Sequence, residues 1–500
     1  MQLISIYYIF FVLISIFLFY ITPKALQKYV LFLASVIFLA CANNAYLNAF
    51  VIITIIATFI SYKGIKGSRK GGWLAFGIIT NLSLLFAFKY LNFFLNNANS
   101  LLSLFTDFSI PVYKFVAPLG ISFYSLQVIG YLLDTYWGKI DSSVSFLLNA
   151  LFITYFPQMT SGPISRFEEL GSQLLEKHKI DLKCIKQGLI RILWGFFKKI
   201  VISARLAVIV DTIYSDTNWY SGMYVWIAAI LFVFQLYTDF SGCMDIISGT
   251  SLCYGIRLPE NFRTPFFSKT VQEFWQRWHI TLGAWMRDYV MFPIMYSNRW
   301  KTFSKNMKAK FGKRNAQFIS SFSAMLLIWL LIGLWHGGDW KYVIGMGVWF
   351  WTCIVLEQMC SSLKLFDQTA ISHSKLKNVL VYAKVLILVA IGNIFFRMNS
   401  LSDSFFTILD GFKNTRLSHF YHNELLLGLN IRDSVILMIG MIVGFFVATV
   451  QEKKGSFFIY FDSQNFLKKT LIIYALVFSI IIFGKYGSNV DASKFIYQGF

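Results

Sequence analysis

The fold class that the sequence predicts is an all-α polytopic membrane protein with about twelve transmembrane helices (range 10–13). Of the 500 residues, 57% are hydrophobic and only 14% are charged, and the mean hydropathy is +0.59. A soluble domain usually has about a quarter charged residues, so an ordinary soluble enzyme is excluded. The 53 Phe and only 8 Pro also exclude a disordered or collagen-like chain. Uncharged apolar runs recur along the chain, and basic residues gather between them.

The net charge of +21 could indicate either a nucleic-acid partner or lysines sorted to one side of a bilayer. The basic residues lie in short connections between apolar runs, which favours the lipid bilayer as partner and gives no support to nucleic acid. The longest cluster, between 298 and 316, has seven Lys and Arg and no acidic residue. Short basic connections stay in the cytoplasm. The clusters agree if the N-terminus lies outside and twelve spans alternate, so that the tail 486–500 also ends outside.

The first apolar run, Ile4 to Thr22, is long enough to cross the ~30 Å hydrocarbon core. No basic segment precedes it and no small-residue cleavage site follows it, so we interpret it as a retained helix and not a signal peptide. Similar runs follow at 45–61, 72–88, 220–237, 317–335, 379–396, 433–450 and 470–484. Weaker runs lie at 29–42, 115–136, 187–210 and 339–360. The interrupted stretches 144–160 and 271–297 are expected to be re-entrant or interfacial.

We expect one membrane domain over 1–500, because no internal repeat or long linker interrupts it. Its core motifs fall in 115–360, its C-terminal spans in 379–484 and an aromatic tail in 486–500. Within 185–210, basic side chains stand among apolar residues, and we expect them to extend to the inner interface. These are Lys186, Arg191, Lys198, Lys199 and Arg205. The six cysteines form no CxxC pair, which indicates small buried hydrophobes.

Two of the six histidines are candidate functional residues. His336 follows Trp335 at the outer end of an apolar span, and His279 ends a stretch dense in Trp and charge. Burying an ionisable residue in a membrane domain is costly, which favours a function. The alternative is a neutral histidine hydrogen-bonded between helices. No metal site is expected, because 57 positions separate the two and no further ligands flank them.

The position of His336 suggests access from outside. A straight helix from Arg314 to His336 rises about 33 Å, which places the histidine toward the outer half of the membrane. Glycines 333, 337 and 338 would allow a backbone or substrate to approach closely. A neutral imidazole there could take a proton from a hydroxyl that enters from outside.

A polar cluster of Asp239, Ser241 and Asp245 ends the apolar run at 220–237. Carboxylates in such a place are costly, so each is expected to have a cationic partner. The candidate partners are Arg257, Arg263, Arg277 and Arg287. An ion-pair network that holds helices together is at least as well supported as a catalytic role.

A helix after the turn at 258–263 is expected to present an aromatic stripe. Its members are Trp275, Trp278, His279, Leu282 and Trp285, which fall at i, i+3 and i+4 spacing and so would share one face. Such a stripe usually serves packing, but this one also carries His279.

The tail is apolar and aromatic, whereas chain ends in solvent are usually polar. It holds Phe495, Tyr497 and Phe500. One interpretation is an aromatic anchor at the membrane interface. The other is that the tail folds back into an outer pocket, where the Tyr497 hydroxyl would be a nucleophile close to His336.

Four sequence motifs of the chain resemble those of a known family. The run from Asp239 to Pro293, together with GLWHGGDW at 333–340, resembles the membrane-bound O-acyltransferase family. APLGISFYSLQVIGYLLDTYWG at 117–138 and YFPQMTSGPISRFEE at 155–169 are similar to its branch of bacterial alginate and peptidoglycan O-acetylation proteins. The resemblance covers nearly the whole chain. It implies helices around a central funnel in the bacterial cytoplasmic membrane.

The resemblance also implies an activity, which is transfer of an acyl group, most simply acetyl, from a cytoplasmic donor to an extracytoplasmic polysaccharide. His336 falls on the family's WHG histidine and is the expected catalytic residue, His279 falls on its second histidine, and Tyr497 falls on a proposed acyl acceptor. Phe495 and Phe500 would dock the tail. The supporting residues are Asp239, Ser241, Asp245, Trp275, Arg277, Trp278, Arg287, Asp288 and Trp335.

No bound cofactor is expected. The donor implied is acetyl-CoA or, alternatively, an acyl carrier protein thioester, and the implied partner is an extracytoplasmic SGNH-hydrolase-like acetyltransferase. Two other functions stay open. One is D-alanyl transfer to teichoic acid, and the other is a transporter or flippase, which broken helices and buried charges would also fit.

Overall fold

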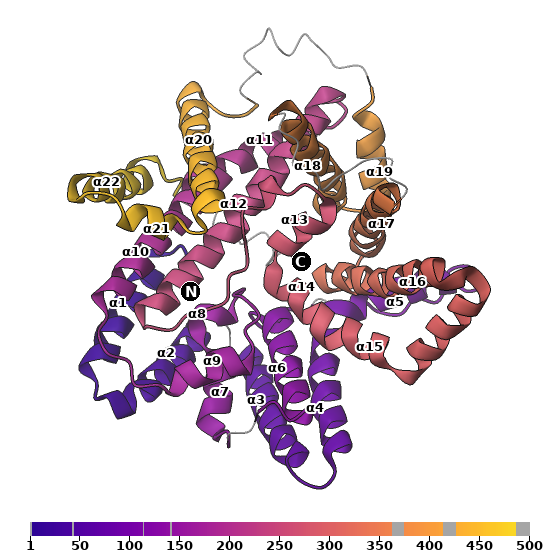
Figure 1. Ribbon diagram of the computed structural model, residues 1–500, viewed down its shortest axis with the longest axis horizontal. Helices are drawn as coiled ribbons and strands as arrows, with labels where there is room; N and C mark the ends of the chain where they lie inside the picture. Colours follow the sequence, from indigo (N-terminus) through magenta and orange to yellow (C-terminus); the bar gives the residue numbers. More distant parts are fainter. Residues whose placement is uncertain are drawn as a thin grey trace. The chain divides into compact units, whose positions relative to one another are not determined.

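The computed structural model describes residues 3–42, 45–113, 115–140, 143–362, 375–413 and 427–486 (Figure 1). These residues are helices and connections, with one isolated bridge between Phe262 and Trp278. The chain divides into two compact units. Unit 1 comprises 1–192 and 243–260, and unit 2 comprises 193–242 and 261–500. The predicted all-α class is confirmed.

Unit 1 holds the helices of the N-terminal part and the end of α12. They are α1 (Ile6–Ile21), α2 (Gln27–Ala42), α3 (Ala45–Ile65), α4 (Lys70–Leu85), α5 (Leu91–Leu102), α6 (Ile121–Tyr136), α7 (Phe146–Thr154), α8 (Phe156–Met159), α9 (Phe167–Leu175) and most of α10 (Leu182–Phe196). Short 3₁₀ and π segments, η1 (Lys24–Leu26) and η2 (Phe86–Tyr90), join some of them.

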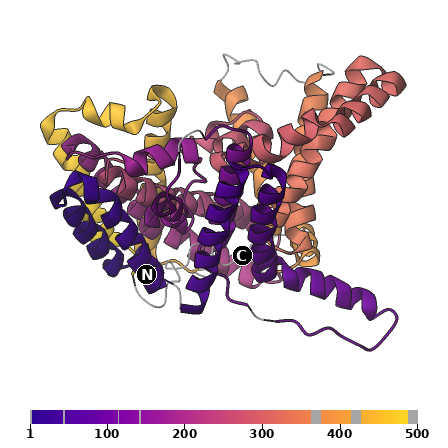
Figure 2. The same cartoon turned by 90° about the horizontal axis from the view of Figure 1, so that it is seen from below.

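Helices α3, α4 and α6 lie side by side in unit 1 (Figure 1). A Cβ on Gly77 of α4 would stand 2.6 Å from the Leu132 side chain of α6, so a larger residue there would displace that side chain. After α5 the chain returns along an extended stretch (Figure 2), which Asn99 holds through both backbone groups of Ile110. These contacts give unit 1 a tight helical bundle.

Unit 2 holds the remaining helices, including most of α12. They are α11 (Ala204–Ser215), α12 (Met223–Cys253), α13 (Val271–Arg277), α14 (Ile280–Met286), α15 (Phe292–Tyr296), α16 (Asn298–His336), α17 (Trp349–Ser362), α18 (Lys375–Arg397), α19 (Leu401–Asp410), α20 (Ile431–Lys454), α21 (Phe457–Asp462) and α22 (Phe466–Phe483). The short segments are η3 (Phe197–Ser203), η4 (Pro265–Phe267), η5 (Arg287–Met291) and η6 (Lys341–Val348).

Local sequence explains where several of these helices begin. Ser297, Ser400, Asn430 and Asn465 stand directly before α16, α19, α20 and α22, and each side chain accepts a backbone N–H of the first turn. Such caps satisfy donors that have no partner within the helix. The core of unit 2 is apolar and aromatic, and it includes buried residues from α12, α13, α16, α17 and α18.

Among the described residues, nine helices are long and apolar enough to cross a membrane, and Ile6–Ile21 is a shorter apolar helix. The nine coincide with nine of the twelve predicted runs. The run at 115–136 folds as α6, which has 16 residues and is buried along almost its whole length. The run at 187–210 folds as parts of α10 and α11 joined by the π-helix η3. Neither of these two runs is among the nine.

The charged side chains of this last run correct a prediction. Lys198, Lys199 and Arg205 were expected to extend to the membrane interface, but they are 5%, 3% and 3% exposed. They are buried because they meet polar partners on other helices: Lys198 donates to Ser241, and Arg205 donates to Asp433 of α20 at 2.8 Å. These cations therefore tie helices of unit 2 together.

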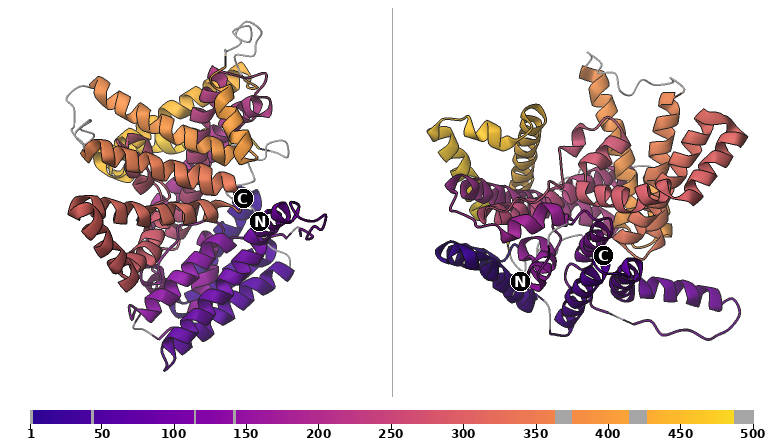
Figure 3. Two further views of the ribbon diagram at one scale, coloured as in Figure 1. Left: turned by 90° about the vertical axis from the view of Figure 1, so that its right-hand side faces the viewer. Right: turned by 60° about the horizontal axis from the view of Figure 1, so that its bottom comes forward.

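The basic stretch at 298–316, expected to be a loop, is helical and forms the first arm of α16. The helix bends at Gly312, whose φ of +76° is left-handed and favours glycine. Figure 3 shows the bend in the salmon-coloured helix. Trp300 of the first arm donates to Ser320 of the second at 3.0 Å, so the two arms fold toward each other.

Helices α10 and α12 approach closely in both units. In unit 1, a Cβ on Gly188 would lie 2.6 Å from the carbonyl oxygen of Gly249, and the reverse distance is also 2.6 Å. In unit 2, a Cβ on Gly242 would lie 2.9 Å from the carbonyl of Gly195. Small residues let helix backbones approach in this way. We call this contact the α10–α12 seam.

Candidate functional site

The two histidines singled out from the sequence both contact one indole ring in unit 2. His336 is the last residue of α16, and His279 lies between α13 and α14. The Trp335 ring centroid lies 5.6 Å from that of His279 and 5.0 Å from that of His336. The histidines are 3% and 4% exposed. The structure thus brings together residues that are 57 positions apart.

Further aromatic rings enclose the pair. Phe240 of α12 meets the His279 ring edge to face at 4.9 Å, and Phe396 of α18 meets the His336 ring in the same way at 5.7 Å. Gly333 keeps this region compact, because a Cβ there would lie 2.4 Å from the carbonyl oxygen of Tyr342. We call the rings of His279, Trp335 and His336 with these two phenylalanines the histidine enclosure.

The predicted aromatic stripe on one helix is wrong. The helix ends at Arg277 and a new one begins at Ile280, because His279 adopts a left-handed φ of +49° between them. A non-glycine residue in this conformation costs about 1–2 kcal/mol, so surrounding contacts must hold it. Trp275 and Trp278 consequently do not share one continuous helix face with Trp285.

Antiparallel pairing with the segment after α12 holds the break. The Arg263 N–H donates to the Arg277 carbonyl at 2.9 Å, and the Ile280 N–H donates to the Asn261 carbonyl at 3.0 Å. The Asn261 side-chain oxygen also accepts from the Thr281 N–H and hydroxyl at 3.1 and 2.9 Å. These bonds join 261–263 to 277–281, and we call the paired segments the 261–281 clip.

His279 lies outside the nine candidate spans. Burial lowers the pKa of His279 to about 3, because desolvation disfavours the imidazolium ion. The ring is therefore neutral at physiological pH. A neutral imidazole can accept a proton at one nitrogen while it donates at the other.

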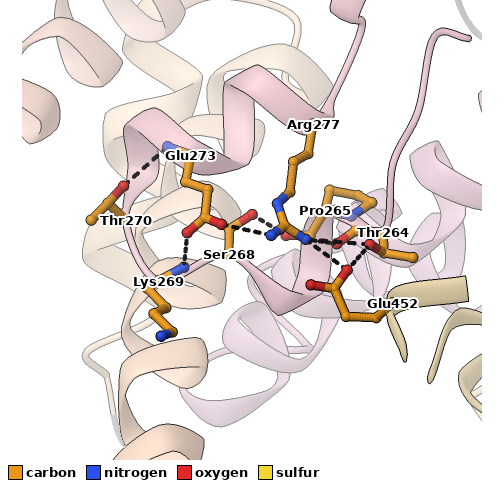
Figure 4. A network of polar contacts seen from close by, with 8 residues as sticks. All are labelled: Thr264, Pro265, Ser268, Lys269, Thr270, Glu273, Arg277 and Glu452. Atoms are coloured by element: carbon orange, nitrogen blue, oxygen red, sulfur yellow. Dashed lines mark hydrogen bonds and ion pairs between the residues drawn. The ribbon is translucent and has the colours of Figure 1, made fainter. Parts of the chain in front are cut away.

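Arg277 belongs to a polar network on the outer side of the clip (Figure 4). Its guanidinium donates to Glu273 at 2.7 Å and to Glu452 at the end of α20 at 2.9 Å. Thr264 donates to the same Glu452 carboxylate. Figure 4 shows Glu452 reaching both Thr264 and Arg277, so α20 links Arg277 of the clip to the residue that follows its 261–263 segment.

The predicted cluster of Asp239, Ser241 and Asp245 lies on α12, along the α10–α12 seam and its continuation into η3, and we include this continuation in the seam. In unit 2, Asp239 pairs with Lys199, and Ser241 accepts from Lys198 at 2.8 Å. In unit 1, Asp245 pairs with Arg191 at 2.9 Å. The expectation of cationic partners is confirmed, but these partners are not among the four arginines proposed from the sequence.

The other supporting residues have packing or surface contacts. Trp275 contacts Trp329 and Phe350 with ring centroids 5.2 and 4.7 Å away. Trp278 stacks on Phe274 at 5.4 Å. Neighbours Arg287 and Asp288 form an ion pair at 2.8 Å, in which the arginine side chain is 53% exposed. Their roles in function stay predictions.

The tail residues Phe495, Tyr497 and Phe500 lie outside the described residues. Within the described ranges there is no group of three or more His, Cys, Asp and Glu residues that could hold a metal ion. The described cysteines Cys41, Cys184, Cys243, Cys253, Cys353 and Cys360 form no disulfide.

The sequence reasoning missed several residues of this region. Asn261 stood out only as part of a turn, and no local pattern showed that it faces His279 and Thr281. Phe240 and Phe396 also escaped notice, because a phenylalanine in an apolar run carries no signal of its own. Lys199 lies 40 positions from Asp239, a separation at which a single sequence gives no pairing information.

These features define a class of protein: an all-α protein with many candidate membrane helices and two buried histidines enclosed among aromatic rings. A family model narrows the class. The model of the membrane-bound O-acyltransferase family matches residues 139–402, and the chain belongs to this family. The match includes both histidines and the 261–281 clip, and it confirms the resemblance and the predicted enzyme class.

Three named relatives show what the chain is similar to in sequence. A protein of Azotobacter vinelandii named probable alginate O-acetylase AlgI is 32% identical over 346 residues, which are 68% of this chain and 65% of that protein. A peptidoglycan O-acetyltransferase of Helicobacter pylori is 32% identical over 343 residues, 63% of this chain and 61% of that protein. A teichoic acid D-alanyltransferase of Bacillus subtilis is 28% identical over 241 residues, 47% of this chain and 57% of that protein.

Proposed function

We propose that the chain transfers an acyl group, most simply acetyl, from a cytoplasmic thioester donor to a hydroxyl of an extracytoplasmic polysaccharide. The observation that carries the proposal is the histidine enclosure, in which His279 and His336 are buried and both contact the Trp335 ring. Family membership and the acetylating relatives support the reaction class.

The chemistry requires a base next to a hydroxyl. In the proposed reaction, a hydroxyl oxygen attacks the acyl carbonyl carbon while the neutral imidazole of His336 takes the hydroxyl proton. The carbon–sulfur bond of the donor then breaks, and the same imidazolium returns its proton to the leaving thiolate. The aromatic walls keep water from the site, so that hydrolysis of the thioester does not compete.

The tail provides a proposed intermediate acceptor. The Tyr497 hydroxyl would first receive the acyl group, and its phenolic ester would then pass the group to the glycan. A phenoxide with a pKa near 10 leaves more readily than an alkoxide, which makes the second step favourable. Phe495 and Phe500 would dock the tail.

The wider setting is part of the proposal. The donor is acetyl-CoA or an acyl carrier protein thioester on the cytoplasmic side, no cofactor is bound, and an SGNH-hydrolase-like transferase receives the group outside. Both termini lie outside in this scheme, and the whole chain works as one domain. The basic connections support the orientation.

The same enclosure would serve D-alanyl transfer to teichoic acid, and the D-alanyltransferase relative supports this second candidate. The relative matches 47% of the chain, whereas the alginate relative matches 68%. Acetyl transfer therefore has the broader support. Mass analysis of surface glycans for acetyl and alanyl esters, with and without the chain, separates the two.

A labelled donor tests the reaction itself. Full-length protein in detergent should consume a thioester donor and retain label, because no gradient is needed for chemistry, whereas a transporter or flippase would leave the donor intact. Label that persists on a Tyr497→Phe chain would exclude the tyrosine step. Undiminished polymer acylation by a stably folded His336→Ala chain would exclude His336 from the mechanism.

A further inference from the structure

The side chain of Asn261 lies at the centre of the 261–281 clip and is buried, with 2% exposure. Its oxygen Oδ1 lies 3.1 Å from the backbone nitrogen of Thr281, 2.9 Å from the Thr281 hydroxyl and 3.3 Å from Nδ1 of His279. One amide atom therefore meets three hydrogen-bonding groups on the first turn of α14 and at its N-terminal end.

The identity of this amide atom follows from the backbone. The oxygen and nitrogen of an asparagine side chain are assigned from their hydrogen-bonding partners. A backbone N–H can only donate, so the atom that faces the Thr281 nitrogen must be the oxygen. The Thr281 hydroxyl, which faces the same atom, then also donates to it.

The same hydrogen-bonding rule places the proton of His279 on Nδ1. An amide oxygen has no hydrogen to donate, so the contact with His279 is a hydrogen bond only when Nδ1 carries the proton. In a neutral imidazole the other nitrogen, Nε2, then holds the lone pair. Which nitrogen of a histidine is protonated depends on the bond that the other nitrogen makes.

We infer that Asn261 is a positioning residue that fixes His279 as the Nδ1-protonated tautomer and so directs its basic nitrogen, Nε2, to the reaction. The role of Nε2 in the reaction rests on the proposed acyl transfer. The assignment of the tautomer does not depend on that function. The left-handed backbone of His279 serves the same end, because the 261–281 clip that holds it also places Nδ1 beside Asn261.

The charged residues near the Asn261–His279 contact form ion pairs with other residues. Phe240 and Trp335 flank the His279 ring, and neither titrates. Asp239, the chain neighbour of Phe240, pairs with Lys199, and Arg277 pairs with Glu273 and Glu452. Because an amide oxygen carries no net charge, Asn261 can fix the tautomer of His279 without stabilising its imidazolium form.

Nitrogen NMR tests the tautomer directly. The full-length chain, labelled with [¹⁵N]histidine and held in detergent, should show a neutral His279 with the proton on Nδ1, and the signal is assigned by its loss in a His279→Gln chain. In Asn261→Leu, which keeps the size but removes the acceptor, the proton should move to Nε2. A wild-type proton on Nε2, or an unchanged tautomer in Asn261→Leu, would overturn the inference.

Two further variants separate positioning from general loosening of the clip. Thr281→Val removes one donor to Asn261 but keeps the backbone N–H and the histidine contact, so the Nδ1 tautomer should persist even if thermal stability falls. Asn261→Asp keeps an acceptor of the same shape, so the tautomer should also persist. Loss of the Nδ1 tautomer in either variant would show that the intact pairing of the clip sets the tautomer of His279, and that the Asn261 oxygen does not.

Kinetics then connect the tautomer to the reaction. In Ser-His-Asp hydrolases, loss of the group that fixes the histidine tautomer lowers kcat by about 10⁴-fold. Asn261→Leu should lower kcat by at least ~100-fold with little change in KM for the donor. Asn261→Asp should regain most of kcat and shift the acidic limb of its pH profile upward by roughly one unit or more, because a carboxylate stabilises the imidazolium.

The outcomes separate the tautomer of His279 from its effect on acyl transfer. An Asn261→Leu chain that loses the Nδ1 tautomer but keeps full acyl transfer would contradict a role of the His279 Nε2 nitrogen in the reaction while the tautomer assignment stands. A chain that loses activity while the tautomer is unchanged, or an Asn261→Asp chain with the wild-type pH profile, would contradict the positioning role of Asn261.

Discussion

The α10–α12 seam and the histidine enclosure both bury ionisable side chains, but they surround them differently. On the seam, Lys199 meets Asp239, and Arg191 meets Asp245, so each cation has a carboxylate in contact. In the enclosure, the rings of His279 and His336 meet Trp335, Phe240 and Phe396. The seam charges are compensated in pairs, whereas the two imidazoles of the enclosure are surrounded by aromatic rings.

The largest expected effect falls on the enclosure. His279→Gln should lower the turnover of labelled donor by about 10²–10⁴-fold, the usual contribution of a positioned acid or base, while the thermal midpoint changes little. His178→Gln is the matched control, because that ring contacts the Gln173 carbonyl and Phe19 in unit 1. Equal turnover of the two variants would mean that His279 contributes no more to acyl transfer than a histidine outside the enclosure.

The next largest effect falls on the stability of the seam. Asp239→Leu or Lys199→Met alone leaves one buried charge without its described partner and should cost about 3–5 kcal/mol in unfolding free energy. The double variant should recover most of this loss, since it removes both charges. Denaturant unfolding in detergent measures all three. Additive losses in the double variant would mean that the pair is not the stabilising unit.

The close helix contact on the seam predicts a smaller loss. Gly188→Ala places a Cβ 2.6 Å from the Gly249 carbonyl oxygen, so the helices must separate at a cost of about 1–3 kcal/mol. Gly72→Ala in α4 is the control, because its Cβ would meet nothing within 4 Å. The control should be neutral or gain about 0.5–1 kcal/mol. Similar thermal midpoints for both variants would argue against the close approach.

The smallest effect is expected outside both regions. Arg287→Gln breaks an ion pair whose arginine is half exposed, and exposed pairs contribute about 0–1 kcal/mol. Unfolding should therefore shift by less than ~1 kcal/mol, and a much larger shift would place this pair in a buried setting.

The sequence predicted the fold class and nine of the spans, because long uncharged runs need no tertiary information to be recognised. It could not show what covers the run at 115–136. An apolar segment of that length looks the same whether lipid or protein covers it, and in the structure protein buries α6. The cations of 187–210 were misjudged for a related reason, since the partners of Lys199 and Arg205 lie on distant helices.

The candidate site was predicted in its two histidines but not in its geometry. The pattern Trp275, Trp278 and Trp285 has helical spacing, yet pairing with residues 261–263 breaks the helix at His279. Tertiary hydrogen bonds override local periodicity there, which no residue spacing reveals. The same bonds place Asn261 beside His279, so the positioning contact appears only in the folded chain.

One measurement tests the central claim that the histidine enclosure performs acyl transfer and the seam only supports it. Single-turnover transfer from a labelled thioester donor is compared between His336→Gln and the double variant Lys199→Met with Asp239→Leu, both as folded full-length protein. We expect His336→Gln to be slower than wild type by about 10²–10⁴-fold and the double variant to remain within a few-fold of it. Wild-type transfer by a folded His336→Gln chain would contradict the account.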